Sequence, residues 1–157
     1  MKIKLAKEKE DFLKCWEVVH ELRPQLDPDR YLTLMLYMID EGYKMIFIEE
    51  DGKAVSFCGY RITTMLYRGR SIYIDDLCTL PQARGQGQAK ALLEYVLKEA
   101  GEEGLESIHL DSGHQRHDAH RLYLNFGFKI SSHHFEMDAK SSIALLNDEV
   151  SDTREAE

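Results

Sequence analysis

Apolar residues recur along the chain with two different periods, and their order predicts the elements of one α/β domain. Short β-rich or alternating apolar runs, typical of strands, lie at residues 3–5, 43–49, 54–65, 71–80, 107–110 and 128–135. Apolar residues at helical spacing lie between these runs, at residues 12–19, 28–39, 88–100 and 116–125. The predicted order is therefore strand, helix, helix, three strands, helix, strand, helix, strand.

Turn signals set the direction of the middle strands. Asp51-Gly52 connects the second and third β-rich runs, and Arg68-Gly69 connects the third and fourth. Asp-Gly between two such runs is a strong hairpin signal, so these three strands should be antiparallel. The later strand, helix, strand order predicts a parallel crossover. We therefore expect a mixed, mostly antiparallel central sheet flanked by helices.

Length and composition favour one domain followed by an acidic end. The chain has 157 residues, of which 43% are hydrophobic, enough for a single compact core. Half of the net charge of −8 comes from the last ten residues, which hold five acids and one arginine. That segment is polar and lacks apolar periodicity, as flexible ends do. We expect a domain over residues 1–140 and a flexible tail over residues 141–157.

Charge and cysteine content exclude several classes of function. An acidic chain without a basic stripe is a poor nucleic-acid binder. No apolar run is long enough to cross a bilayer, and the N-terminus lacks a signal-peptide core, so no membrane partner is expected. Cys15, Cys58 and Cys78 lack metal or redox spacing and fit reduced, buried thiols. These features favour a cytoplasmic protein.

A glycine-rich turn lies between the fourth β-rich run and the most regular helix. Residues 82–87 read QARGQG, and the following helix begins near residue 88. Such a turn aims unpaired backbone N–H groups of the helix start at one point, where they can hold a phosphate. We therefore predict an anion site at this turn.

Glycine-rich turns of this kind occur in several types of phosphate site, and each type requires particular residues. A Walker loop requires Lys followed by Ser or Thr, but Lys90 is followed by Ala91. A dinucleotide fingerprint needs a third small residue where the chain has Lys90, and an early βαβ unit. Glycines that serve only a tight turn leave the adjacent Arg84 unexplained. A phosphate site of another kind is favoured.

Two segments resemble signatures of the GCN5-related N-acetyltransferases (GNAT). Residues 82–89, QARGQGQA, are similar to that family's acyl-CoA pyrophosphate loop, with the pattern Gln/Arg-x-x-Gly-x-Gly/Ala. Residues 119–128, AHRLYLNFGF, resemble its second signature, a helix with Ala-x-x-x-Tyr that ends in Gly-Phe. The predicted order of elements is also similar to that fold over residues 1–137. The resemblance implies a single-domain, GNAT-like α/β fold.

The resemblance also implies acetyl-CoA as the cosubstrate. Its pyrophosphate would be held by the backbone N–H groups of Arg84, Gly85, Gln86, Gly87, Gln88 and Ala89. The Arg84 side chain could add positive charge there. A splay after the fourth strand would let the pantetheine arm pair as an added strand beside Leu77, Cys78 and Thr79. Arg116 stands where the family often has Asn, so it either meets a CoA phosphate or faces solvent.

Acetyl transfer needs an acid for the leaving CoA thiolate, and Tyr123 matches the position of the family's tyrosine. A phenol with a pKa of about 10 can protonate a thiolate within hydrogen-bond reach. The other interpretation is a core tyrosine, because Tyr123 shares an apolar face with Leu122 and Phe126. A buried hydroxyl needs a polar partner, which favours the acid.

The amine must also lose a proton. Asp75 and Asp76 are adjacent on a predicted strand and should face opposite sides, so one carboxylate points to the cleft. From its position relative to the glycine turn we assign Asp76 as the base. The alternatives are that both are solvated or ion-paired strand residues, or that water relays the proton.

Histidines cluster late in the chain, but their spacing does not favour a metal. His114, His117 and His120 are three residues apart, and the outer pair diverges around a helix; His133 and His134 follow. We expect no metal site, and we expect these histidines to line a substrate cleft.

We therefore predict an acetyl-CoA-dependent N-acetyltransferase that acts by direct transfer on a primary amine of a small molecule or of a peptide or protein. The alternatives are a non-catalytic acyl-CoA-binding module that senses or regulates, and a phosphate-binding domain unrelated to CoA. By the resemblance, Met35, Tyr37 and Met38 would form one wall of the acceptor cleft. The motifs specify neither the acceptor nor the oligomeric state; dimers are common in the resembled family, so a homodimer is one expected state.

Overall fold

The computed structural model describes residues 1–144. The helices and strands are β1 (Ile3–Leu5), α1 (Lys9–Leu22), α2 (Pro28–Asp40), β2 (Lys44–Glu50), β3 (Lys53–Met65), β4 (Gly69–Thr79), the 3₁₀ turn η1 (Pro81–Ala83), α3 (Gln88–Glu102), β5 (Ile108–Leu110) and α4 (His117–Phe126). None of the described helices is long and apolar enough to cross a bilayer.

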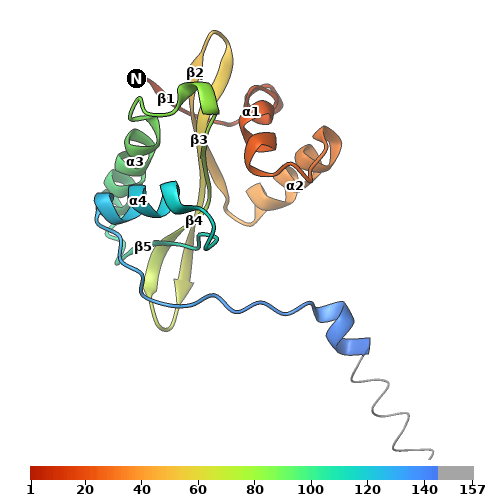
Figure 1. Ribbon diagram of the computed structural model, residues 1–157, viewed down its shortest axis with the longest axis vertical. Coiled ribbons are helices and arrows are strands. Elements are labelled where there is room, and N and C mark those ends of the chain that lie inside the picture. The colour runs from red at the N-terminus through yellow and green to blue at the C-terminus, as the bar shows by residue number, and fades with distance from the viewer. Residues whose placement is uncertain (145–157) are drawn as a thin grey trace, which may run out of the picture. The chain divides into compact units, whose positions relative to one another are not determined.

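One five-stranded sheet, in the order β1-β2-β3-β4-β5, is the centre of the unit Met1–Gly127. The first four strands are antiparallel neighbours, and β5 runs parallel to β4. Helices α1 and α2 cover one face of the sheet, and α3 and α4 cover the other (Figure 1). The predicted fold class, a mixed and mostly antiparallel sheet flanked by helices, is confirmed.

Local sequence signals set the ends of the first elements. Asp51 and Gly52 have φ values of 49° and 80°, the left-handed conformation that a two-residue hairpin turn needs between β2 and β3. Asp27 caps α2, because its Oδ1 accepts the N–H of Arg30 at 2.8 Å. Pro28 is the first residue of that helix, where its fixed φ is favourable.

Buried apolar side chains hold the helices on the sheet. Residues 54–60 of β3 are all buried, as expected for a central strand covered on both faces. Helix α1, on one face, contributes buried residues that include Cys15 and Val18, and α3, on the other face, contributes buried residues that include Leu92 and Val96. Each of these four side chains is fully buried. The core therefore lies on both sides of β3.

The three cysteines are free thiols, as the sequence predicts. Cys15 and Cys58 are buried, and Cys78 is half-buried. Burial raises the pKa of Cys15 to about 12 and that of Cys78 to about 11. Both thiols therefore keep their protons at neutral pH.

The last predicted strand is wrong. Residues 128–135 form no strand, and a second unit of the chain begins at Phe128. Phe128 and Ile130 would face one side of such a strand, whereas Phe135 would face the other, and serines and histidines fill the positions between. No continuous apolar face exists to bury, and Ile130 and Phe135 are 79% and 91% exposed.

The predicted boundary between a domain over residues 1–140 and an acidic tail stays a prediction. Residues 139–144 are helical. The remainder of the expected tail, residues 145–157, lies outside the described residues.

Candidate functional site

The predicted anion site is the turn that enters α3. Gly85 and Gly87 have φ values of 76° and 80°, a left-handed conformation that glycine adopts at no steric cost. The N–H of Ala91 is the first to join the helix, donating to Gly87 O at 3.0 Å. Within the described part of the chain, the N–H groups of residues 85–90 make no hydrogen bond. They are therefore available to an anion at the positive end of the helix.

Two residues of the predicted loop are tied to other elements. The N–H of Arg84 closes the turn η1, and its guanidinium donates to Thr79 O at 3.0 Å and to Glu21 at 3.1 Å. Gln88 is 2% exposed, and its Nε2 donates to Glu50 at 2.9 Å. These side chains fasten the loop to β4, α1 and β2, so the backbone N–H of Gln88, rather than its side chain, is open to a ligand.

One edge of β4 is unpaired beside this loop. Strand β5 pairs with β4 only as far as Ile74. Beyond it, the N–H of Leu80 and the C=O of Cys78 bond to β3 residues at 2.9 and 3.0 Å. Because backbone groups alternate sides along a strand, those of Leu77 and Thr79 point away from β3. No other strand among the described residues pairs with that edge, which is the splay that the resemblance implies.

A β-bulge in β4 places two carboxylates on one face. Gly59 of β3 pairs with Asp76, and the next residue, Tyr60, pairs with Ile74, so Asp75 is an extra residue. Neighbouring residues of a regular strand face opposite sides, but a bulge changes the direction of a side chain. Asp75 and Asp76 both line the same cavity. The expectation that they face opposite sides is therefore wrong.

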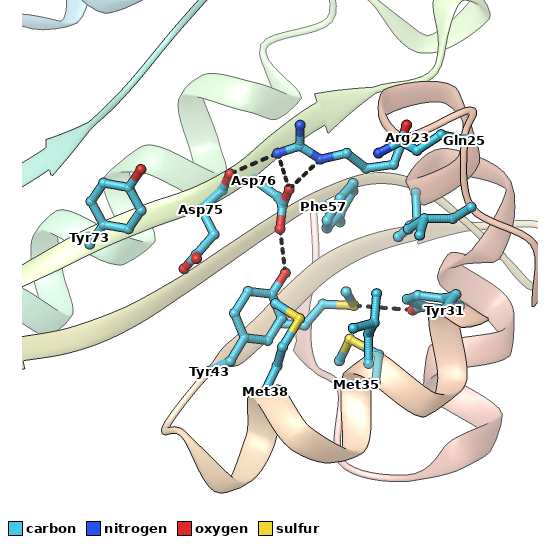
Figure 2. A pocket seen from close by; sticks show the side chains of 14 residues that line it. Arg23, Gln25, Tyr31, Met35, Met38, Tyr43, Phe57, Tyr73, Asp75 and Asp76 are labelled. Carbon is cyan, nitrogen blue, oxygen red and sulfur yellow. Dashed lines mark hydrogen bonds and ion pairs between the residues drawn. The ribbon is translucent and has the colours of Figure 1, made fainter. Parts of the chain in front are cut away.

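Asp76 is fully engaged by two neighbours. Arg23 donates to Oδ1 from Nη2 at 2.7 Å and from Nε at 3.1 Å, and the hydroxyl of Tyr43 donates to Oδ2 at 2.9 Å (Figure 2). Burial, together with the Asp76 charge, raises the pKa of Tyr43 far above its usual value. Gly59 makes this contact possible, because a Cβ there would lie 1.7 Å from the Tyr43 hydroxyl oxygen.

Asp75 keeps one oxygen free. Its Oδ2 accepts from Arg61 Nε at 3.0 Å, and within the described residues its Oδ1 has no hydrogen bond. Burial raises the pKa of Asp75 above its ordinary value, and the Arg61 guanidinium opposes that rise. Of the two carboxylates, only Asp75 can therefore accept a further hydrogen bond without losing one that it already makes.

The predicted acid, Tyr123, is half-buried on α4. Burial raises its pKa to about 12, the Cys58 and Cys78 thiols add to the rise, and Arg116 opposes it. The same arginine also lowers the pKa of Cys78. Tyr123 and Arg116 therefore both lie within electrostatic range of Cys78, which belongs to the part of β4 that β5 leaves unpaired. The phenol keeps its proton at neutral pH and can donate it.

A cavity of about 370 Å³ lies beside the carboxylates. The helices α1 and α2, the loop between them and the strands of the sheet contribute the residues that line it, which are Val19, Arg23, Gln25, Leu26, Tyr31, Leu34, Met35, Met38, Tyr43, Met45, Phe57, Tyr73, Asp75 and Asp76. Of the predicted acceptor wall, Met35 and Met38 are present, whereas Tyr37 is 67% exposed and does not line the cavity.

The histidines do not gather into a metal site within the described residues. There, no group of three His, Cys, Asp or Glu side chains is arranged to hold an ion. His120 contacts Gly113 O at 2.9 Å through Nε2, and its ring lies 6.3 Å from that of His117. No histidine lines the cavity, so the expected role in a substrate cleft is not supported there.

Sequence reasoning missed Arg23, Tyr43 and Arg61, which hold the two aspartates. Arg23 is 53 residues from Asp76, and Tyr43 is 33 residues from it. Neither belongs to a motif, and only the folded sheet brings them together. Gly42 precedes Tyr43 and Gly59 lies two residues before Arg61, but a nearby glycine does not indicate that a side chain contacts a carboxylate.

Comparison with known proteins identifies N-acetyltransferases among the relatives of this chain. The model of the acetyltransferase (GNAT) family matches residues 7–128. The uncharacterized N-acetyltransferase YhdJ of Bacillus subtilis is 33% identical over 129 residues, covering 81% of this chain and 91% of that protein. The aminoalkylphosphonate N-acetyltransferase of Salmonella typhimurium is 40% identical over 62 residues, which are 40% of each chain.

Solved structures share the fold at low identity. The structure of AAC(6')-Iy with the bisubstrate analogue CoA-S-monomethyl-acetylneamine has a TM-score of 0.74 and 16% identity, covering 88% of this chain and 98% of that one. A ribosomal-protein-alanine N-acetyltransferase from Brucella melitensis has a TM-score of 0.74 and 19% identity, covering 88% and 99%. At these identities the likeness establishes the fold.

Proposed function

Because the chain belongs to the acetyltransferase (GNAT) family and is an acetyl-CoA-dependent N-acetyltransferase, we propose that it transfers acetyl directly to a primary amine held beside Asp75. The observation that supports this proposal is the unpaired edge of β4, which lies between the free N–H groups of residues 85–90 and the carboxylates of the cavity. No observation favours a non-catalytic acyl-CoA sensor. Thiol release from acetyl-CoA in the presence of amines is the direct test.

The chain's own groups would hold the cosubstrate along this edge. The N–H groups of residues 85–90 would bind the pyrophosphate, and the backbone groups of Leu77 together with the N–H of Thr79 would pair with the pantetheine arm, since the Thr79 carbonyl already accepts from Arg84. Arg116 lies close enough to the edge to add positive charge. Arg84 would add charge by exchanging its bond to Glu21 for one to a phosphate. Its amide already closes η1, so the cradle would begin at Gly85.

CoA should raise the melting temperature of the wild-type protein, and Gly87→Ala should reduce that shift. At a hundred times the Kd, a ligand of the native state adds about 2.7 kcal/mol of stability. Gly87 has a left-handed φ at the centre of the free N–H groups, so a Cβ would strain the turn and crowd the phosphate. The measurement is thermal unfolding with and without CoA.

Gly104→Ala is the matched control. Gly104 follows α3, is also left-handed with a φ of 64°, and has open space where a Cβ would lie. Both variants should lose about 1–2 kcal/mol of stability from backbone strain, but only Gly87→Ala should lose CoA binding. An equal CoA shift in both variants would place the pyrophosphate elsewhere.

The reaction moves three protons. The ammonium loses one before its nitrogen attacks the thioester carbonyl, and as the C–N bond forms and the C–S bond breaks the nitrogen loses a second one to water. Tyr123 would give its proton to the CoA thiolate and then recover one from water, so that the products are the neutral amide and the CoA thiol. The sequence pointed to Asp76 for the first proton, but both oxygens of Asp76 accept present bonds. We therefore assign Asp75 to the amine, directly or through water, and Asp76 to holding Arg23 and Tyr43 in place.

Asp75→Asn should lower kcat/KM by about 10²- to 10⁴-fold, the range for a lost general base. The raised pKa of Asp75 means that the wild-type rate rises as pH increases through a value above the ordinary range for Asp. This acidic limb should vanish in the variant. The melting temperature should not fall, because the buried charge of Asp75 disfavours folding at pH values above its raised pKa and the variant removes that charge.

Asp76→Asn tests the other assignment. It should keep the acidic limb but lower the melting temperature, because Arg23 and Tyr43 lose their charged partner. If Asp76→Asn abolishes the limb and Asp75→Asn preserves it, the base is Asp76, as the sequence alone suggests. The measurement for both variants is kcat/KM against pH, together with thermal unfolding.

A further inference from the structure

Charged and apolar groups occupy different walls of the cavity. The carboxylates of Asp75 and Asp76 come from β4, and that of Asp76 contacts the Arg23 guanidinium (Figure 2). The wall supplied by α2 is apolar, through Leu34, Met35 and Met38. A molecule that fills this space therefore meets charge at one end and hydrocarbon or thioether at the other.

The hydrogen bonds already present leave room for one ammonium. Asp75 Oδ1 is free within the described residues, whereas both oxygens of Asp76 accept bonds from Arg23 and Tyr43. A second ammonium against the α2 wall would meet Leu34, Met35 and Met38, none of which offers it a charged partner in exchange for its water. Diamines and larger polycations therefore fit this cavity poorly.

The same bonds disfavour an acceptor that carries a carboxylate. Arg23 is the one cationic side chain that lines the cavity among the described residues. Its Nε and Nη2 donate to the Asp76 carboxylate, and Nη2 also donates to Asp75 O at 3.3 Å. A substrate carboxylate would have to displace these bonds beside two negative charges. Amino acids are thus unfavourable acceptors.

The volume suits a small acceptor. A cavity of about 370 Å³ lies in the range of sites that bind small molecules. Methionine side chains adapt their shape, so Met35, Met38 and Met45 suit an apolar body of variable outline.

We propose, on the basis of the transferase function above, that the acceptor is a small primary monoamine whose amino group sits at Asp75 and whose apolar body packs against Met35 and Met38. The acceptor has no second charge. Its acetylation removes its only positive charge, so the product leaves the carboxylates as a neutral amide.

A homologous series of linear amines measures the apolar contact. From propylamine to hexylamine, kcat/KM for thiol release should rise about threefold to fourfold for each methylene, the value of a buried CH₂. Two molecules of the same length with a second charge, 1,6-diaminohexane and 6-aminohexanoate, should fall about tenfold or more below hexylamine. A short peptide with an apolar first residue completes the panel.

Met38→Glu should invert part of this preference. Met38 is half-buried on α2 and lines the cavity, so a carboxylate there would receive the second ammonium of 1,6-diaminohexane. The ratio of kcat/KM for the diamine to that for hexylamine should increase by about tenfold or more. Leu36→Glu, on the same helix but 69% exposed and outside the cavity, should leave the ratio unchanged.

The results separate this inference from the proposed function. Thiol release that is flat across the series, or faster with the diamine, the amino acid or the peptide, overturns the monoamine acceptor and leaves acetyl transfer intact. An unchanged ratio in Met38→Glu also overturns it. No thiol release with any amine, together with no thermal shift by CoA, overturns the transferase function itself.

Discussion

Replacing Tyr123 with phenylalanine should lower kcat by about 10²- to 10⁴-fold, the usual contribution of a positioned general acid. The phenylalanine keeps the ring that α4 packs and removes only the hydroxyl. CoA affinity should change little, because the loop N–H groups of residues 85–90 are untouched. Since burial raises the pKa of Tyr123 to about 12, the acid stays protonated over the whole working range, and the wild-type rate should show no alkaline loss from this group before the pH nears that value.

Tyr67→Phe is the control for this change. Tyr67 lies between β3 and β4 and is 89% exposed, so loss of its hydroxyl removes no packed group. Single-turnover thiol release isolates the chemical step from product release. Full activity in Tyr123→Phe, with an unchanged pH profile, would show that the thiolate takes its proton from another group.

Gly59→Ala should destabilise the fold and disable the carboxylate site together. The added Cβ would lie 1.7 Å from the Tyr43 hydroxyl oxygen and 2.3 Å from Cζ, so the ring must leave its place. Overpacking of this kind costs about 1–3 kcal/mol. For a chain of this size that lowers the melting temperature by roughly 2–4 °C for each kcal/mol. Asp76 also loses the Tyr43 bond, and the bulge that presents Asp75 loses its support.

A second-site change tests the cause. In Gly59→Ala combined with Tyr43→Leu, the clashing ring is absent, so the loss of stability should be smaller than the sum of the two single losses. Gly101→Ala is the control, because Gly101 lies in α3 with open space at its Cβ position. It should be neutral or stabilising by about 0.5–1 kcal/mol. Additive losses in the double variant would mean that Tyr43 is not what Gly59 accommodates.

The glycine turn before α3 and the helix that carries Tyr123 could be predicted because their signals are local. The turn has a left-handed φ at residues 85 and 87, which favours glycine at both positions. The spacing of apolar residues predicts the helix that follows. Tyr123 lies a fixed four residues before Gly127, the left-handed residue that ends α4. Such features depend on neighbours in the chain, and the structure has them as expected.

The arrangement of the carboxylates could not be predicted in this way. Whether Asp75 and Asp76 share a face depends on the register between β3 and β4, which shifts at Gly59. That register depends on residues far apart in the sequence. Two adjacent aspartates in a strand give no local sign of whether the strand contains a bulge. The last strand fails for a related reason, because its β-rich residues do not form one face that the sheet could bury.

The unpaired edge of β4 has a consequence for the protein without its cosubstrate. Exposed edges of sheets are templates on which other chains add strands, and proteins usually protect them. Here protection by a loop or helix would block the place that the pantetheine arm is proposed to fill. Bound CoA would therefore protect this edge. Without CoA the enzyme would be inactive and more prone to self-association. The edge beyond Ile74 is short, which limits that risk while keeping the space open.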